Sequence, residues 1–182
     1  MIRELLANSS PHPGFAKWLK NKDLIRISAA VINNIANGES PAAHLDFLLP
    51  AEEFKIIRKN DKIYVDPRSY KRYNRAAAIF SSLDSAVIMS LYRQAKPLIE
   101  EAFKDLGFPR EEFDDTLRRA ITILLQVPVI EKKIELEEKV TTYALKDPAL
   151  EKLTPAQKHL LRMGPGNTKK IQAKLKEISD QL

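Results

Sequence analysis

The basic side chains of the C-terminal third are the residues whose types and spacing best suit a specific chemistry. Between residues 152 and 176 the chain has seven lysines and arginines and no aspartate or glutamate. Lys169 and Lys170 closely follow Asn167, at the expected start of a helix. Free N–H groups at a helix start, together with two ammonium groups, can hold an anion. Simple helix capping by Asn167 explains the same residues and is the favoured interpretation.

A second basic run covers Lys55–Arg75, with eight lysines and arginines, two aspartates and three interleaved tyrosines. Basic residues alternating with aromatic ones can bind single-stranded nucleic acid. However, Tyr70 and Tyr73 are three residues apart and would share one face of a helix. We therefore favour packing of both rings in a core, with Lys71 and Arg72 facing water.

The residue types that usually carry catalysis or bind metals show no productive spacing. His12, His44 and His159 form neither H-x-x-x-H nor H-E-x-x-H, so a zinc site is unsupported. The absence of cysteine excludes disulfides and thiolate chemistry. Carboxylates concentrated in residues 100–115 suit helix ends, and the serines lack G-x-S-x-G or S-x-x-K contexts. No catalytic residue, metal ligand or cofactor is assigned.

Length and composition fit one soluble domain over residues 1–182, with 44% hydrophobic and 30% charged residues. No stretch of about 18 apolar residues predicts a membrane span. The N-terminus lacks the basic and apolar regions of a secretory signal. A net charge of +6 fits nucleic acid, anionic lipid or an acidic protein, and charge alone does not choose between them.

Helical spacing of apolar residues predicts most of the elements that must position these side chains. Pro97 lies inside one of them and should kink or split it. Thr154 and Gln157 predict a capping box, and Gly164 a left-handed helix stop. The expected helices are a short one opened by His12-Pro13, five that cover residues 23–37, 70–83, 84–107, 111–125 and 154–163, and a last segment that Asn167 could cap.

Short β-prone segments complete the expected fold. Phe54–Arg58 and Lys62–Val65 flank Asn60-Asp61 and predict a hairpin. Two further short strands are expected around Glu137-Glu138, and they could extend that hairpin. The sequence therefore predicts a mainly helical α+β domain of about seven helices with a small antiparallel sheet.

One string near the C-terminus is specific enough to suggest a family. The segment Leu160–Asn167 resembles the bacterial domain-of-unknown-function family 3014, and the likeness extends over almost the whole chain. Further matching segments are Asp23–Arg26, Asn34–Pro41, Asp66–Tyr73, Leu91–Arg93, Pro128-Val129 and Asp147–Glu151. Two departures are the lack of the Gly-Pro pair expected near Lys132-Lys133, and Gly166 where a glutamate is expected.

The resemblance implies an envelope protein of Gram-negative bacteria, in which an N-terminal transmembrane helix and a proline-rich linker precede this domain. The chain would then be the soluble periplasmic part of an anchored protein at the inner membrane. The family has no established activity, so the resemblance brings no catalytic residues.

The first functional hypothesis is a non-enzymatic interaction or scaffold domain. Its partner would be an acidic protein or an anionic membrane surface, and the sequence does not indicate the oligomeric state. The residues expected to bind an anion or a partner are Arg68, Lys71, Arg72, Arg162, Asn167, Lys169, Lys170 and Lys174.

Two alternatives remain open. One is an enzyme of unrecognised type, with a cleft near Arg68, Tyr70, Tyr73 and Arg162. The other, less favoured, is a weak nucleic-acid binder. A deep pocket holding at least two convergent ionisable groups would favour the enzyme, whereas a flat surface would favour the interaction domain.

Overall fold

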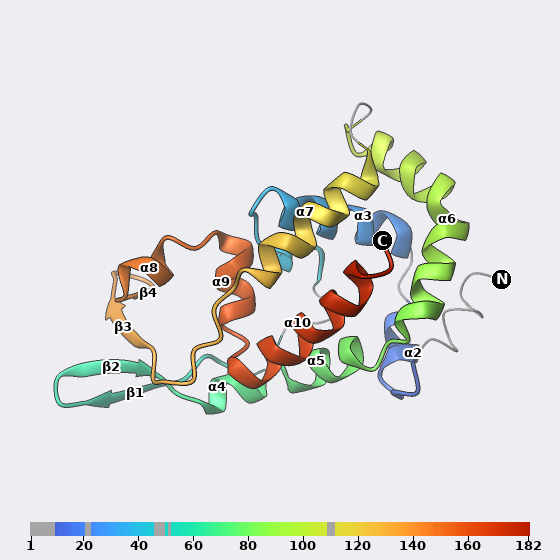
Figure 1. Cartoon of the computed structure of the whole chain (residues 1–182). Helices are drawn as coiled ribbons and strands as arrows, with labels where there is room; N and C mark the ends of the chain where they lie inside the picture. Colours follow the sequence, from blue (N-terminus) through green and yellow to red (C-terminus); the bar gives the residue numbers. More distant parts are fainter. Residues whose placement is uncertain (1–9, 21–22, 46–49, 51, 109–111) are drawn as a thin grey trace.

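The computed structural model describes residues 10–20, 23–45, 50, 52–108 and 112–182, except for the side chains of residues 17 and 18. Figure 1 shows a larger helical part and, at one end of the molecule, a small sheet with short helices beside it. The prediction of a mainly helical α+β fold is therefore confirmed. The helices are α2 Phe15–Trp18, α3 Leu24–Ala36, α4 Arg68–Lys71, α5 Asn74–Ser81, α6 Ser85–Asp105, α7 Phe113–Leu125, α8 Pro148–Glu151, α9 Pro155–Leu161, α10 Pro165–Ser179 and the 3₁₀ turn η1 Pro41–His44.

The sheet has four antiparallel strands in the order β1-β2-β3-β4. The strands are β1 Ile56–Lys59, β2 Lys62–Val65, β3 Glu135–Glu138 and β4 Tyr143–Leu145. Asn60 and Asp61 have φ angles of 51° and 56°, which is the left-handed pair that a tight hairpin turn requires. The predicted hairpin is confirmed, and the second pair of strands extends it. Glu137-Glu138 belongs to β3, so the second turn comes later, within residues 139–142.

Successive side chains along each strand point to opposite faces of the sheet, and apolar side chains gather on one of these faces. Val65, Leu136 and Leu145 lie on it, because Leu136 pairs with both Ile63 and Leu145 in register. This face packs against residues of α8 and α9, including the buried Leu161, in one core cluster. The strands are too short to be stable alone and depend on these helices.

The helical part has cores of its own. α3 packs on α7, while α10 packs on α5, α6 and α7. Phe103 of α6 and Phe113 of α7 meet edge to face and are almost fully buried. Pro97 does not split α6, which continues as one helix past it and curves along its length in Figure 1. No helix in the described ranges has both the length and the apolar character needed to cross a bilayer.

Two expected helix boundaries differ from the structure. The helix expected over 70–83 is divided into α4 and α5, with Arg72 and Tyr73 between them. The last helix starts at Pro165 rather than after Asn167, because Gly164 (φ 84°, ψ 163°) precedes a proline that suits the first helical position. That conformation is open essentially to glycine alone. The positive φ predicted for Gly164 is confirmed, but its ψ is extended rather than left-handed helical, and the residue is the N-cap of α10, whereas α9 already ends at Leu161.

The capping box that starts α9 is confirmed. The Gln157 backbone N–H donates to Thr154 Oγ1 at 3.3 Å, and the Thr154 N–H donates to Gln157 Oε1 at 3.1 Å. Both bonds satisfy donors that a helix start otherwise leaves free. They fix the start of α9 and therefore the direction of the helix, whose C-terminal end places Leu161 and Arg162 near the sheet.

Candidate anion-binding pocket

A cavity with a volume of about 340 Å³ lies between the apolar face of the sheet and the helices α4 and α9. Its volume is within the range of small-molecule sites. Segments distant in the sequence contribute to it, from Phe54, two residues before β1, to Arg162, directly after α9. The lining residues are Phe54, Val65, Tyr70, Arg72, Ile134, Leu136, Thr142, Tyr143, Leu145, Leu161 and Arg162.

Arg72 is the most firmly held charged group of the pocket. Its Nε–H donates to the Ser69 carbonyl at 2.9 Å, and its Nη1–H donates to the Glu52 carbonyl at 2.8 Å. The guanidinium carbon also lies 5.7 Å from the centre of the Phe54 ring and 5.3 Å from that of Tyr73. These contacts fix the guanidinium without neutralising it, and no carboxylate among the described residues pairs with it.

Arg162 is the second cation of the pocket and is held differently. It lies directly after α9, and its side chain is exposed. A positive charge at this position stabilises the helix, because the C-terminal end of a helix carries a partial negative charge. Within the described part of the chain, no hydrogen bond or ion pair engages its guanidinium. Burial lowers the pKa of the neighbouring His159, and the charge of Arg162 lowers it further, so this imidazole is neutral at pH 7.

The remaining lining is apolar or hydroxylic, so no acidic group offsets the two arginines within the described wall of the pocket. Phe54 and Tyr143 meet there with ring centres 6.3 Å apart. Burial raises the pKa of Tyr70, which therefore stays protonated at neutral pH. An anion entering the pocket would meet two positive charges beside a low-dielectric surface, where electrostatic attraction is stronger than in water. The Glu151 carboxylate, which is not part of the lining, interacts electrostatically with Arg162.

The structure separates the other predicted binding residues from this pocket. Arg68 and Tyr73 are not among its lining residues, and Arg68 is bonded to the buried Asp66 through Nε at 2.8 Å. The hydrogen bond from Arg68 lowers the pKa of Asp66, so this pair is internally neutral. Lys71 is exposed on α4.

Lys169 and Lys170 are both exposed on α10, but they differ in their surroundings. Lys169 pairs with Glu131, whereas Lys170 has no ion-pair partner among the described residues. Neither lysine lines the pocket. The expected anion site at the start of α10 is therefore reduced to one uncompensated ammonium group.

Asn167 is buried and serves the fold rather than an exposed surface. Its Nδ2 donates to the carbonyls of Tyr70 at 3.0 Å and Met163 at 2.9 Å, and to Asn74 Oδ1 at 3.0 Å. These contacts join α10 to α4 and to the end of α9. The expectation that Asn167 faces an anion is wrong, because its side-chain amide is used up inside the protein.

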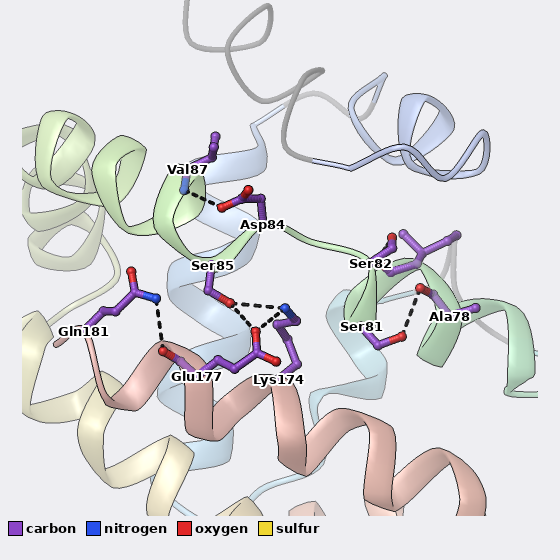
Figure 2. A network of polar contacts seen from close by, with 10 residues as sticks. Ala78, Ser81, Ser82, Asp84, Ser85, Val87, Lys174, Glu177 and Gln181 are labelled. Carbon is purple, nitrogen blue, oxygen red and sulfur yellow. Dashed lines mark hydrogen bonds and ion pairs between the residues drawn. The ribbon is translucent and has the colours of Figure 1, made fainter.

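Lys174 is also buried, with 8% of its surface exposed. Figure 2 shows Lys174 and Glu177, both from α10, turned toward Ser85 at the start of α6. The Lys174 ammonium donates to Glu177 and to Ser85 Oγ at 3.2 Å, and Ser85 Oγ donates to Glu177 Oε2 at 2.8 Å. Lys174 is therefore not exposed to a partner, because Glu177 on the same helix neutralises its charge and Ser85 of α6 accepts a further hydrogen bond from it.

The charged side chains of the lining are suited to holding an anion. Arg72 and Arg162 both line the pocket, and an arginine stays protonated at any physiological pH and does not exchange protons with a substrate. The other polar lining groups are the hydroxyls of Tyr70, Thr142 and Tyr143. Sequence reasoning identified the two arginines and Tyr70, but not the wall formed by Phe54, the strands and the β3–β4 turn.

Comparison with known proteins gives a family and no further relative. Neither the curated proteins nor the solved structures yield a significant match. A family model described as a protein of unknown function (DUF3014) matches residues 24–179, a range that includes α3 to α10 and the whole sheet. The chain therefore belongs to the DUF3014 family of proteins of unknown function.

Proposed function

We propose that this chain is a non-enzymatic binding module whose pocket receives an acidic group of its partner. The observation that supports the proposal most strongly is the state of Arg72. Two carbonyls and two aromatic rings hold its guanidinium in place, and no described carboxylate neutralises it. A preorganised donor of this kind binds a carboxylate or phosphate with little loss of side-chain entropy.

The binding role is preferred to the enzymatic alternative because of what the pocket arginines can do. Catalysis by proton transfer needs a group whose pKa lies near the working pH. Both convergent charged groups of the pocket are guanidiniums, whose charge does not change. They can hold and orient an anion, and this is the role we assign to them.

The proposal extends to the surroundings of the protein. The module would be the soluble periplasmic part of an anchored envelope protein, docking an acidic protein or an anionic membrane surface. The family resemblance and the net charge of +6 support this placement. Protease added to spheroplasts that contain the full-length protein tests the location, since digestion from outside requires a periplasmic domain.

Side-chain NMR of arginine tests the binding role directly. The Nε–Hε signals of ¹⁵N-labelled protein are followed during titration with sodium acetate at constant ionic strength. We expect the Arg72 and Arg162 signals to shift in a saturable way, because a guanidinium can donate two parallel hydrogen bonds to the carboxylate of acetate.

Arg26 and Arg75 are the internal controls, because both are exposed and have no bonded partner among the described residues. Their signals should move little. If all four arginines shift together and without saturation, acetate acts only through general screening, and the proposed binding site does not exist.

A further inference from the structure

We infer that the pocket takes a hydrocarbon chain that carries a single anionic head group, such as an acyl carboxylate. This inference rests on the proposed function and names the class of ligand for the same site. It follows from three features of the pocket: the hydrogen-bonding state of its floor, the position of its charges, and its size.

The backbone N–H groups beneath the central part of the pocket floor already have partners within the protein. Val65 and Leu136 project from β2 and β3, whose backbones are paired with strands on both sides. Leu145 lies on the edge strand β4, but its N–H donates to Glu151 Oε2 at 2.8 Å. A peptide lying there would bury amide groups without partners, which is costly, whereas a hydrocarbon has none to satisfy.

The polar groups of the lining are few and suit one head group. Arg72 and Arg162 are the charged residues of the lining, and Tyr70, Thr142 and Tyr143 add hydroxyls. Both guanidiniums keep N–H groups that are free to donate, so each could donate to a carboxylate or a phosphate that enters the pocket. The arrangement therefore matches an amphiphile with one anionic end.

The size of the cavity limits the length of the chain. A volume of about 340 Å³ is at the low end of the range for small-molecule pockets, so a long two-chain lipid would not fit inside it. Leu136, Leu145 and Leu161 are almost fully buried, so a single medium-length chain would rest mainly on the exposed ring of Phe54 and on the small part of these leucines that faces the pocket. The gain should be roughly fourfold in affinity for each methylene that leaves water.

The test is a calorimetric titration of the whole chain with acetate, hexanoate, octanoate and decanoate, each below its critical micelle concentration. We expect affinity to rise from acetate to decanoate, and we expect decyltrimethylammonium, which has the same chain length but a cationic head, not to bind. Lysophosphatidic acid is a parallel arm. Tighter binding of this lipid than of decanoate would point to a membrane source of the ligand, and the reverse order to a free fatty acid.

Two variants connect the binding to the pocket. Arg162→Gln should lower the affinity for decanoate by roughly tenfold or more, because it removes one of the two charged donors of the pocket. Lys170→Gln, which removes an exposed cation outside the pocket, should leave the affinity unchanged. Thr142→Trp adds a large ring at an exposed position of the pocket wall, keeps the Thr142 carbonyl that accepts from Lys139, and should block decanoate.

The outcomes separate this inference from the proposed function. Equal affinities for acetate and decanoate, both lost in Arg162→Gln, would overturn the hydrocarbon ligand and leave an anion-binding module. Decyltrimethylammonium binding as tightly as decanoate would overturn the inference, since the head group would then be irrelevant. An acidic peptide that binds through Arg162 while decanoate does not would overturn it in favour of a protein partner. If no anion binds at all, the proposed function fails as well.

Discussion

Arg72 in the pocket and Lys174 between the helices both come from basic stretches of the sequence, but their surroundings are opposite. Lys174 is neutralised by Glu177 and also bonds to Ser85, and its charge contributes to joining α10 and α6 (Figure 2). Arg72 is held only by carbonyls and aromatic rings, which leave its charge unneutralised. The local charge count therefore does not decide whether a cation is neutralised, because both residues come from basic stretches and only Lys174 has a carboxylate partner among the described residues.

Gly164 lies between the two regions, and replacing it should have the largest effect on both. Its φ of 84° disfavours any side chain, and a Cβ there would stand 2.3 Å from Cγ of Tyr70, a pocket wall residue. Gly164→Val should lower the free energy of unfolding by about 4 kcal/mol or more, from strain and overpacking together. The free energy of unfolding of the variant and the parent is measured by urea titration.

Gly166→Ala is the matched control. A Cβ at Gly166 meets nothing within 4 Å, and the residue lies in the first turn of α10. This variant should be as stable as the parent or more stable by about 0.5–1 kcal/mol. An equal fall in the free energy of unfolding in the two variants would show that the backbone conformation of Gly164 is not specially required between α9 and α10.

Lys174→Met should have the next largest effect, because it removes the charge that links α10 to α6. We expect the melting temperature to fall by about 2–4 °C, measured by circular dichroism. Lys170→Met, on the same helix but exposed and without an ion-pair partner in the described chain, should change it by less than about 1 °C. If Lys174→Met melts at the parent temperature, the neutralised cation is not a structural link.

Acid should weaken the helical region through the same cluster. Hydrogen bonds from Lys174, and then from Ser85, lower the pKa of Glu177 in the folded state below its ordinary value of 4.5. A lowered folded pKa gives stability that is present above the ordinary value and is lost as the pH falls through the folded value. The free energy lost between about pH 6 and about pH 3 should therefore be smaller in Lys174→Met than in the parent.

Arg162→Gln should have the smallest effect on stability. Its side chain is exposed and no described residue bonds to it, so the melting temperature should stay within about 1 °C of the parent. Its charge is also constant over the range where Glu177 titrates, so the acid profile should be unchanged. A fall of several degrees would give Arg162 a structural role and remove the contrast with Lys174.

The local elements could be predicted because their determinants are local. The turn at Asn60-Asp61, the capping box at Thr154 and the positive φ of Gly164 each depend on a few adjacent residues. The division between α4 and α5 was missed, because Arg72 and Tyr73 fit helical spacing as well as they fit a turn.

The distribution of charge could not be predicted, because it depends on pairing across the fold. The basic stretch from residue 152 to 176 has no acid within it, yet carboxylates outside the stretch pair with three of its lysines. The pairs are Lys158–Glu151, Lys169–Glu131 and Lys174–Glu177. The pocket was missed for the same reason, since Phe54 and Tyr143 meet only after β1 and β4 have taken their places at opposite edges of the sheet.

The most direct test of the central claim is anomalous diffraction from crystals of the whole chain soaked in bromide. Bromide is an anion that reports uncompensated positive charge without needing a known ligand. We predict an anomalous peak in contact with the guanidiniums of Arg72 and Arg162, and no peak at the Lys174 ammonium. An empty pocket in crystals that hold bromide at other surface cations, or a peak at Lys174, would contradict the account.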